Sequence, residues 1–272
     1  MPRRGGLYRR GWWSTWSRVH GLRLHARRTF TPVGTKPVVL VHGLLVSSRY
    51  MAPLARSLSR YADVWAPDMP GFGRSENPSR VLDVDGLARA LNAWLDATDL
   101  NDVVLAANSF GCQYAARAVA RDPSRIAGLV LLGPTFEPGQ RDPVGPALRW
   151  LANAPFEPPS LGVVVLRDLL DAGMWRAVAT YRHALAHAIE EDLARVARPV
   201  LVVRGGRDPL IVQEWADRCA AIAGAGRAVS VPRAAHTINY NSAAAVAALI
   251  RPLLDRPGEG FDEGASRVRA EA

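Results

Sequence analysis

Residues 103–111 read Val-Val-Leu-Ala-Ala-Asn-Ser-Phe-Gly, and this stretch decides the fold. Its apolar, β-branched start predicts a strand buried on both faces, and the amphipathic pattern of residues 112–120 predicts a helix directly behind it. Ser109 would then stand at the tip of a sharp strand-to-helix turn. Ala107 and Gly111 lie two positions before and after it and are small, as the close approach of two backbones requires. The pattern is typical of a serine nucleophile, although a serine that caps a helix has the same spacing.

The same alternation of buried strands and amphipathic helices extends along the chain on both sides of this turn. A hairpin is predicted at 19–30, where two alternating stretches flank His20 and Gly21. Short apolar runs predict further strands at 38–41, 63–66, 129–132, 200–203 and 228–231. Apolar residues at helical spacing predict helices at 51–61, 84–97, 213–222 and 243–254. Strands that alternate with helices favour an α/β fold with a mostly parallel sheet and an N-terminal hairpin.

The chain divides into five predicted segments. Residues 1–17 are a basic, Trp-rich N-terminal segment, and residues 18–133 form the first part of the core. Residues 134–198 contain helix-like patterns and many prolines, and we expect them to form a helical cap inserted over the carboxyl edge of the sheet. Residues 199–254 complete the core. Residues 255–272 are rich in Gly and charge, and we expect this tail to be disordered.

Composition excludes several classes of protein. A chain of 272 residues with 49% hydrophobic residues can bury a sizeable core, which excludes wholesale disorder. Cys112 and Cys219 are too few for a disulfide framework and fit a reducing compartment. The sequence contains no apolar run of about 18 residues, so no membrane span is expected. The N-terminus also lacks the apolar stretch of a secretory signal, and we therefore expect a cytoplasmic protein.

The net charge of +9 is concentrated near the N-terminus, because residues 1–62 carry 12 Lys or Arg and no Asp or Glu. Almost all these basic residues are Arg, and no nucleic-acid motif accompanies them, so nucleic-acid binding is not expected. Trp12, Trp13 and Trp16 lie among the arginines, where we expect them to cover strands of the sheet. A peripheral membrane contact through this segment stays an alternative. Oligomeric state is not predicted.

Residues with catalytic chemistry follow two of the later predicted strands. Asp208 ends a Gly-rich loop after the strand at 200–203, and His236 follows the strand at 228–231. The carboxyl ends of parallel strands meet at one edge of a sheet, so both residues should lie near Ser109. A serine hydroxyl needs a base, and a histidine oriented by a carboxylate is such a base. We therefore predict Ser109 as nucleophile, His236 as base and Asp208 as its partner; a helix cap and a bracing histidine are the alternatives.

The loop that contains His42, Gly43 and Leu44 follows another predicted strand. A turn here can aim a backbone N–H at the same pocket, so we predict an oxyanion hole formed by the N–H groups of Leu44 and Phe110. The side chain of His42 is expected to brace the loop. Together with Gly43 and Asn108, it is expected to support or line the pocket.

Five motifs together resemble a known superfamily. They are Val-His-Gly-Leu at 41–44, Asp-Met-Pro-Gly-Phe-Gly-Arg-Ser at 68–75, Asn-Ser-Phe-Gly at 108–111, Gly-Gly-Arg-Asp-Pro at 205–209 and Ala-His-Thr-Ile-Asn-Tyr at 235–240. Residues 20–254 resemble a capped serine hydrolase with the α/β-hydrolase fold, in which the catalytic residues follow in the order Ser, Asp, His. The turn at Asn108 and Ser109 is similar to that of the meta-cleavage-product hydrolases, which cleave carbon–carbon bonds. The resemblance also argues against haloalkane dehalogenase and epoxide hydrolase chemistry, which the superfamily performs with Asp at the position of Ser109.

The residues and the resemblance together predict a cofactor-free hydrolase of a small, largely apolar carboxylic ester or related acyl compound, acting through an acyl-enzyme. One alternative is hydrolysis of a carbon–carbon bond in a dienoate-type acid. A cap arginine that points into the pocket, such as Arg167, Arg176 or Arg182, would favour that alternative, although we expect these side chains to be solvated. Further alternatives are an acyltransferase or perhydrolase, and a non-catalytic binding module.

Two other patterns in the sequence do not lead us to predict a functional site. His183 and His187 have the spacing of metal ligands on a helix, but Ala184 stands where the zinc-hydrolase pattern needs Glu, so no metal site is predicted and a solvated helix face is expected. Cys112 is expected to be a small buried residue and not a catalytic thiol.

Overall fold

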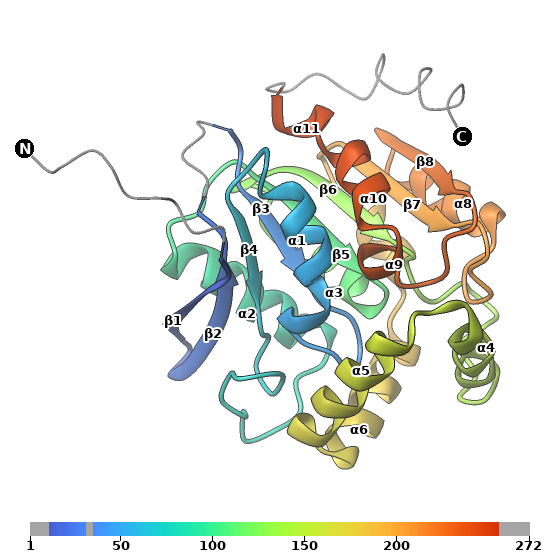
Figure 1. The fold of residues 1–272 in the computed structure, drawn as a ribbon, viewed down its shortest axis with the longest axis horizontal. Helices are drawn as coiled ribbons and strands as arrows, with labels where there is room; N and C mark the ends of the chain where they lie inside the picture. The colour runs from blue at the N-terminus through green and yellow to red at the C-terminus, as the bar shows by residue number, and fades with distance from the viewer. Residues whose placement is uncertain (1–10, 31–34, 256–272) are drawn as a thin grey trace, which may run out of the picture.

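The computed structural model describes residues 11–30 and 35–255. Its centre is an eight-stranded sheet in the order β1-β2-β4-β3-β5-β6-β7-β8 (Figure 1). The strands are β1 (Trp13–Val19), β2 (Leu22–Arg28), β3 (Val38–Val41), β4 (Val64–Pro67), β5 (Val103–Asn108), β6 (Ile126–Leu132), β7 (Val200–Gly205) and β8 (Gly226–Val231). β2 pairs antiparallel with β1 and β4, and the other pairs are parallel. This confirms the predicted α/β fold with a mostly parallel sheet and an N-terminal hairpin.

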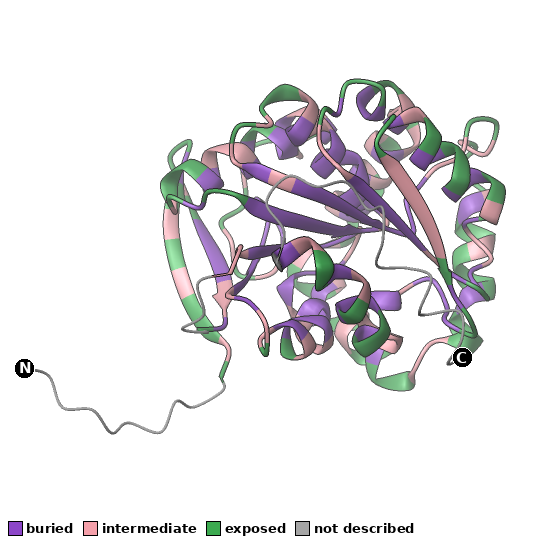
Figure 2. Cartoon of the chain, turned by 90° about the horizontal axis from the view of Figure 1, so that it is seen from above, coloured by how far each residue is buried: buried purple, intermediate pink, exposed green. Residues whose placement is uncertain are grey.

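Helices cover both faces of the sheet, and Figure 2 shows the buried strands between the two layers. One layer contains α2 (Val84–Ala97), α3 (Phe110–Arg121), α7 (Ile189–Leu193) and α8 (Gln213–Ile222). The other contains η1 (Ser48–Met51), α1 (Ala52–Leu58), α9 (Ile238–Asn241), α10 (Ala243–Ile250) and α11 (Pro252–Asp255). Successive residues of a strand enter opposite cores: Val39 packs against the first layer, and Val38 and Leu40 pack against the second. Central strands are therefore apolar at every position, as the sequence shows.

The chain between β6 and β7 is helical and is called the helical insertion (residues 134–198) below. Besides α7 it contains α4 (Gly145–Asn153), η2 (Ala154–Phe156), α5 (Pro159–Ala172) and α6 (Met174–Ala186). In Figure 1, α4, α5 and α6 lie beyond the carboxyl ends of the parallel strands. Asp168 of α5 ties the insertion to the loop after β3, because it accepts hydrogen bonds from the backbone N–H (2.7 Å) and hydroxyl (2.8 Å) of Ser47 and pairs with Arg49.

Two element boundaries differ from the sequence predictions. β1 begins at Trp13 and pairs with β2 along its whole length, so the predicted segment boundary at residue 17 falls inside a strand of the sheet. The predicted helix at 243–254 is divided into α10 and α11, because Pro252 has no backbone N–H to continue the first helix. Most of the basic N-terminal segment and the tail at 256–272 lie outside the described residues.

Neither a membrane span nor a metal cluster is found in the part of the chain that the structure describes. No helix there is long and apolar enough to cross a bilayer. No group of three or more His, Cys, Asp or Glu side chains in these residues could hold a metal ion. Cys112 and Cys219 are buried and free.

Candidate active site

Ser109 connects β5 to α3 in a backbone conformation that few residues adopt. Its φ is 56° and its ψ is −125°, and Phe110 begins the helix immediately after it. A Cβ atom added at Gly111 would lie 2.6 Å from the backbone oxygen of His42, so only glycine fits this position. Strand and helix therefore approach each other closely, and the turn holds the Ser109 side chain at the carboxyl edge of the sheet.

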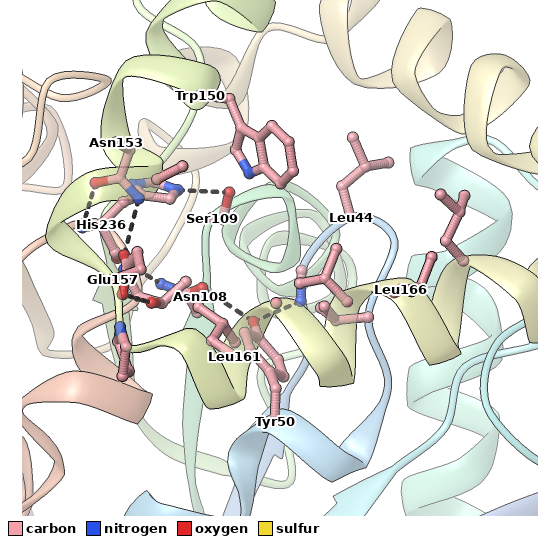
Figure 3. Close-up of a pocket in the computed structure, with 18 of the residues that line it drawn as sticks. Leu44, Tyr50, Asn108, Ser109, Trp150, Asn153, Glu157, Leu161, Leu166 and His236 are labelled. Atoms are coloured by element: carbon pink, nitrogen blue, oxygen red, sulfur yellow. Dashed lines mark hydrogen bonds between the residues drawn. The ribbon is translucent and has the colours of Figure 1, made fainter.

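Three predicted residues from separate strand ends form one hydrogen-bonded array. Nε2 of His236 lies 2.9 Å from Oγ of Ser109, and Nδ1 of His236 lies 2.7 Å from Oδ2 of Asp208 (Figure 3 shows the first of these contacts). The other carboxylate oxygen of Asp208 accepts the backbone N–H groups of Leu210 (2.8 Å) and Ile211 (3.3 Å). With Nδ1–H donated to a carboxylate, Nε2 is free to accept the hydroxyl proton of Ser109.

The pKa of His236 is set by opposing effects. The ring is buried, and burial alone lowers the pKa because it disfavours the imidazolium. The charge of Asp208 and the hydrogen bond to it act in the opposite direction, with a smaller contribution from the charge of Glu157, and the net pKa is raised above 6.5. The array can therefore stabilise a transferred proton on His236 while the serine oxygen acts on an electrophile.

His42 braces the loop after β3. Its Nδ1–H donates to the backbone oxygen of Gly43 (2.9 Å), and its Nε2 accepts the backbone N–H of Met69 (3.0 Å). Burial lowers the pKa of His42, so the ring is neutral and keeps one donor and one acceptor. This arrangement fits the bracing interpretation of the side chain. Leu44 and Phe110 line a cavity together with Ser109, as an oxyanion hole from their N–H groups requires.

Tyr50 is a buried residue that the sequence analysis missed. Its hydroxyl accepts the backbone N–H of Gly43 (2.8 Å) and donates to Oδ1 of Asn108 (2.9 Å). The amide of Asn108 donates to the backbone oxygen of Leu132 (2.8 Å). This chain joins the loop after β3 to the turn that carries Ser109. It also occupies the Gly43 N–H, so that donor is not available to the pocket.

The helical insertion holds the loop that carries His236, and no local sequence pattern predicted this (Figure 3). Oδ1 of Asn153 accepts the backbone N–H of His236 (3.1 Å). Oε1 of Glu157 accepts the backbone N–H of Thr237 (2.8 Å) and the side-chain amide of Asn153 (2.8 Å), and its Oε2 accepts the Thr237 hydroxyl and the side-chain amide of Asn241 (2.8 Å). These hydrogen bonds hold the backbone of the His236 loop, and so they help to position the His236 ring relative to Ser109.

Replacing Glu157 with glutamine should move the acid limb of a kcat/KM–pH profile to lower pH. The charge of Glu157 raises the pKa of His236, so its removal lowers that pKa and the neutral base persists at lower pH. Thr237→Val is the matched control, because it removes one hydrogen bond to Glu157 and leaves the charge in place. An acid limb that moves equally in both variants, or in neither, contradicts this role for the Glu157 charge.

Two apolar lobes of a cavity meet at Ser109. One has a volume of about 360 Å³ and includes Leu161 and Leu166 of α5. The other has a volume of about 340 Å³ and includes Met174 of α6. Leu44, Ser109 and Trp150 line both lobes. A reacting bond placed at Ser109 would therefore have one apolar substituent on each side.

The remaining candidate residues do not join this site. Arg167, Arg176 and Arg182 line neither lobe, and Arg176 packs against Gly71 instead of being fully solvated. His187 is half-buried and bonds Oδ2 of Asp192 (2.8 Å), so the expected solvated helix face is wrong at that position. Burial raises the pKa of Cys112 well above its usual value, which disfavours a thiolate there.

Known proteins match this chain in sequence and in fold. Haloalkane dehalogenase 1 of Mycobacterium tuberculosis is 33% identical over 45% of this chain and 42% of its own length. The 2-hydroxy-6-oxo-2,4-heptadienoate hydrolase of Pseudomonas putida is 38% identical over 36% of this chain and 37% of its own length. These matches thus span less than half of the curated relatives.

A thermophilic esterase from Thermogutta terrifontis has the same fold, with a TM-score of 0.74 at 20% identity over 88% of this chain and 97% of that one. Residues 38–249 match the profile of the alpha/beta hydrolase family, which is more than half of the chain. This stretch includes Ser109, Asp208 and His236. The chain belongs to the alpha/beta hydrolase family.

Proposed function

We propose that this protein hydrolyses small, largely apolar carboxylic esters through an acyl-enzyme on Ser109. The observation that carries the proposal is the array of Ser109, His236 and Asp208 at the junction of two apolar lobes. An ester has one substituent on each side of its reactive carbonyl, the acyl chain and the alkoxy group, and the two lobes offer a place for each. Among the described residues, no Lys or Arg side chain lines either lobe, so neither lobe offers a cation to a substrate carboxylate.

The mechanism follows from the atoms that face one another. His236 takes the hydroxyl proton of Ser109 as its oxygen attacks the carbonyl carbon, and Asp208 stabilises the imidazolium. The N–H groups of Leu44 and Phe110 stabilise the oxyanion, each worth about 3–4 kcal/mol of transition-state stabilisation. His236 then protonates the leaving alcohol. A water molecule, deprotonated by the same ring, attacks the acyl-enzyme, and the carboxylic acid leaves as Ser109 regains its proton.

The proposal predicts how hydrolysis depends on acyl-chain length. In a series of p-nitrophenyl esters, kcat/KM should rise about fourfold for each methylene that enters a lobe, since burying a methylene contributes about 0.8 kcal/mol. It should then fall once the acyl chain exceeds the lobe. Stopped-flow absorbance at the nitrophenolate band should also show an initial burst as the acyl-enzyme accumulates. Rates that are highest for acetate and decline steadily, or no hydrolysis of any ester, would overturn the proposal.

Hydrolysis of a carbon–carbon bond is the second candidate function. It is favoured by the relative named as a 2-hydroxy-6-oxo-2,4-heptadienoate hydrolase and by Asn108 directly before the serine. The lobes give it less support, because Arg167, Arg176 and Arg182 all lie outside their lining and no guanidinium faces a substrate carboxylate. If the protein turned over a dienoate acid and hydrolysed no ester, carbon–carbon bond hydrolysis would be the better interpretation. Dehalogenase activity is not proposed for this chain, because that chemistry uses an aspartate at the position of Ser109.

A further inference from the structure

The helical insertion exposes an unusual number of large apolar side chains. Eleven of the fifteen large hydrophobic residues that are exposed in the described chain lie between residues 144 and 178, on α4, η2, α5 and α6. The most exposed are Trp175 (78%), Leu170 (75%) and Val163 (70%). Single exposed apolar residues are common on protein surfaces, but a concentration in one segment marks an interaction surface. These exposed apolar side chains between residues 144 and 178 are called the apolar face.

The exposed residues of α5 follow the period of the helix, so they form one stripe. Val163, Leu166 and Leu170 are separated by three and four positions and all face solvent. The opposite side of α5 is anchored by buried Asp168, whose carboxylate bonds to Ser47. The inward side of α5 also carries buried Leu161, so the helix is apolar on both sides and leaves one apolar stripe in water. An exposed stripe of this kind marks a surface that an apolar partner can cover.

Between residues 144 and 182 of the described chain, the charged side chains that have no bonded partner are arginines. Three carboxylates lie between residues 144 and 178, and each is already bonded: Asp168 and Asp171 to Arg49, and Glu157 to Thr237 and its neighbours. Arg167 is exposed between Leu166 and Leu170, and Arg182 is exposed on α6. Neither arginine forms an ion pair within the described residues. An anionic lipid layer suits such a surface, because its acyl chains can take up the apolar side chains and its headgroups can bind the free arginines.

We propose that the apolar face of α4, α5 and α6 docks on an anionic lipid surface. A second copy of this chain fits less well: a two-fold contact would place the free arginines of one face against those of the other, and the three carboxylates between residues 144 and 178 are already bonded. The face also borders the site, since Trp150 and Leu166 line the first lobe and Trp150 and Met174 line the second. Docking would thus bring the mouth of the cavity to the lipid. The sequence-based alternative of a membrane contact near Trp13 lies on β1, outside this face.

Co-sedimentation of the full chain with vesicles tests the proposal. Vesicles with about 30 mol% phosphatidylglycerol in phosphatidylcholine should bind the protein at low salt, and binding should weaken at about 0.5 M NaCl. The double variant Leu170→Ser/Trp175→Ser should lower the partition coefficient at least tenfold, because both side chains leave water on docking. Arg167→Gln and Arg182→Gln should each lower it about fivefold at low salt. Trp13→Ser is the matched control, because Trp13 is also an exposed tryptophan (56%) and should leave binding unchanged.

All the substituted side chains are exposed, so each variant should keep its thermal melting curve. None of them lines a lobe, so each variant should also keep its rate on a short water-soluble ester. Ser109→Ala should bind vesicles like the unaltered chain, so failure of the esterase proposal leaves this test intact. Absence of vesicle binding at low salt overturns the proposal. So does loss of binding in Trp13→Ser instead of the double variant. A concentration-dependent dimer in sedimentation velocity that the double variant abolishes would assign the face to a second copy.

Discussion

Replacing Ser109 with alanine should lower kcat for ester hydrolysis by about 10⁶-fold, because the proposed acyl-enzyme forms on the Ser109 oxygen. The change removes only Oγ, the atom that lies 2.9 Å from Nε2 of His236. Alanine has the same Cβ as serine, so the strained turn and the fold should be retained. A fluorophosphonate probe should label the unaltered protein at Ser109 and should not label the variant, as peptide mass spectrometry can show.

Cys112→Ala is the matched control for this experiment. Cys112 lies one turn further along α3, is fully buried and has a raised pKa, so it should contribute neither to labelling nor to turnover. Labelling that persists in Ser109→Ala, or that disappears in Cys112→Ala with the fold intact, would place the nucleophile elsewhere. A folded protein that neither reacts with the probe nor hydrolyses any ester would favour the binding-module alternative.

Much of the framework around this serine could be predicted because its signals are local. β3, β5 and β7 are short, largely apolar runs; His42 and Ser109 follow β3 and β5 directly, and Asp208 lies three residues beyond the end of β7. Parallel strands bring their carboxyl ends to one edge, so chain order alone predicts that Ser109, Asp208 and His236 lie near one another. The structure places them within hydrogen-bonding distance. Their catalytic roles stay a prediction until the substitutions are made.

The contacts that hold the site together could not be predicted in this way. Glu157 and Thr237 are 80 positions apart, and Glu157 belongs to none of the five motifs. Tyr50 and Asn108 are 58 positions apart and meet only because β3 and β5 are neighbours in the sheet. The first pair depends on how the helical insertion packs and the second on the order of strands in the sheet, and hydrophobic periodicity carries no information about either. For the same reason, the sequence did not show that α5 turns its apolar stripe toward water.

Replacing Asp208 with asparagine should lower kcat by about 10⁴-fold while the fold is retained. The reason lies in the other contacts of this side chain. Its Oδ1 accepts the backbone N–H groups of Leu210 and Ile211, so the amide oxygen of asparagine must take that position. The amide NH₂ would then face Nδ1 of His236 and force it to act as an acceptor. Nε2 would carry the proton, and a protonated Nε2 cannot accept the hydroxyl proton of Ser109.

The same substitution should change the pH dependence of the residual activity. Asp208 is the group that raises the pKa of His236 against burial, so its loss lowers that pKa and moves the acid limb of kcat/KM to lower pH. Asp217→Asn, the same change at an exposed position on α8, should leave both the rate and the pH profile unchanged. A pH–rate series on all three proteins decides the matter. An Asp208→Asn rate within about tenfold of the unaltered enzyme would mean that His236 does not depend on this carboxylate for its tautomer, and the proposed proton transfer would fail.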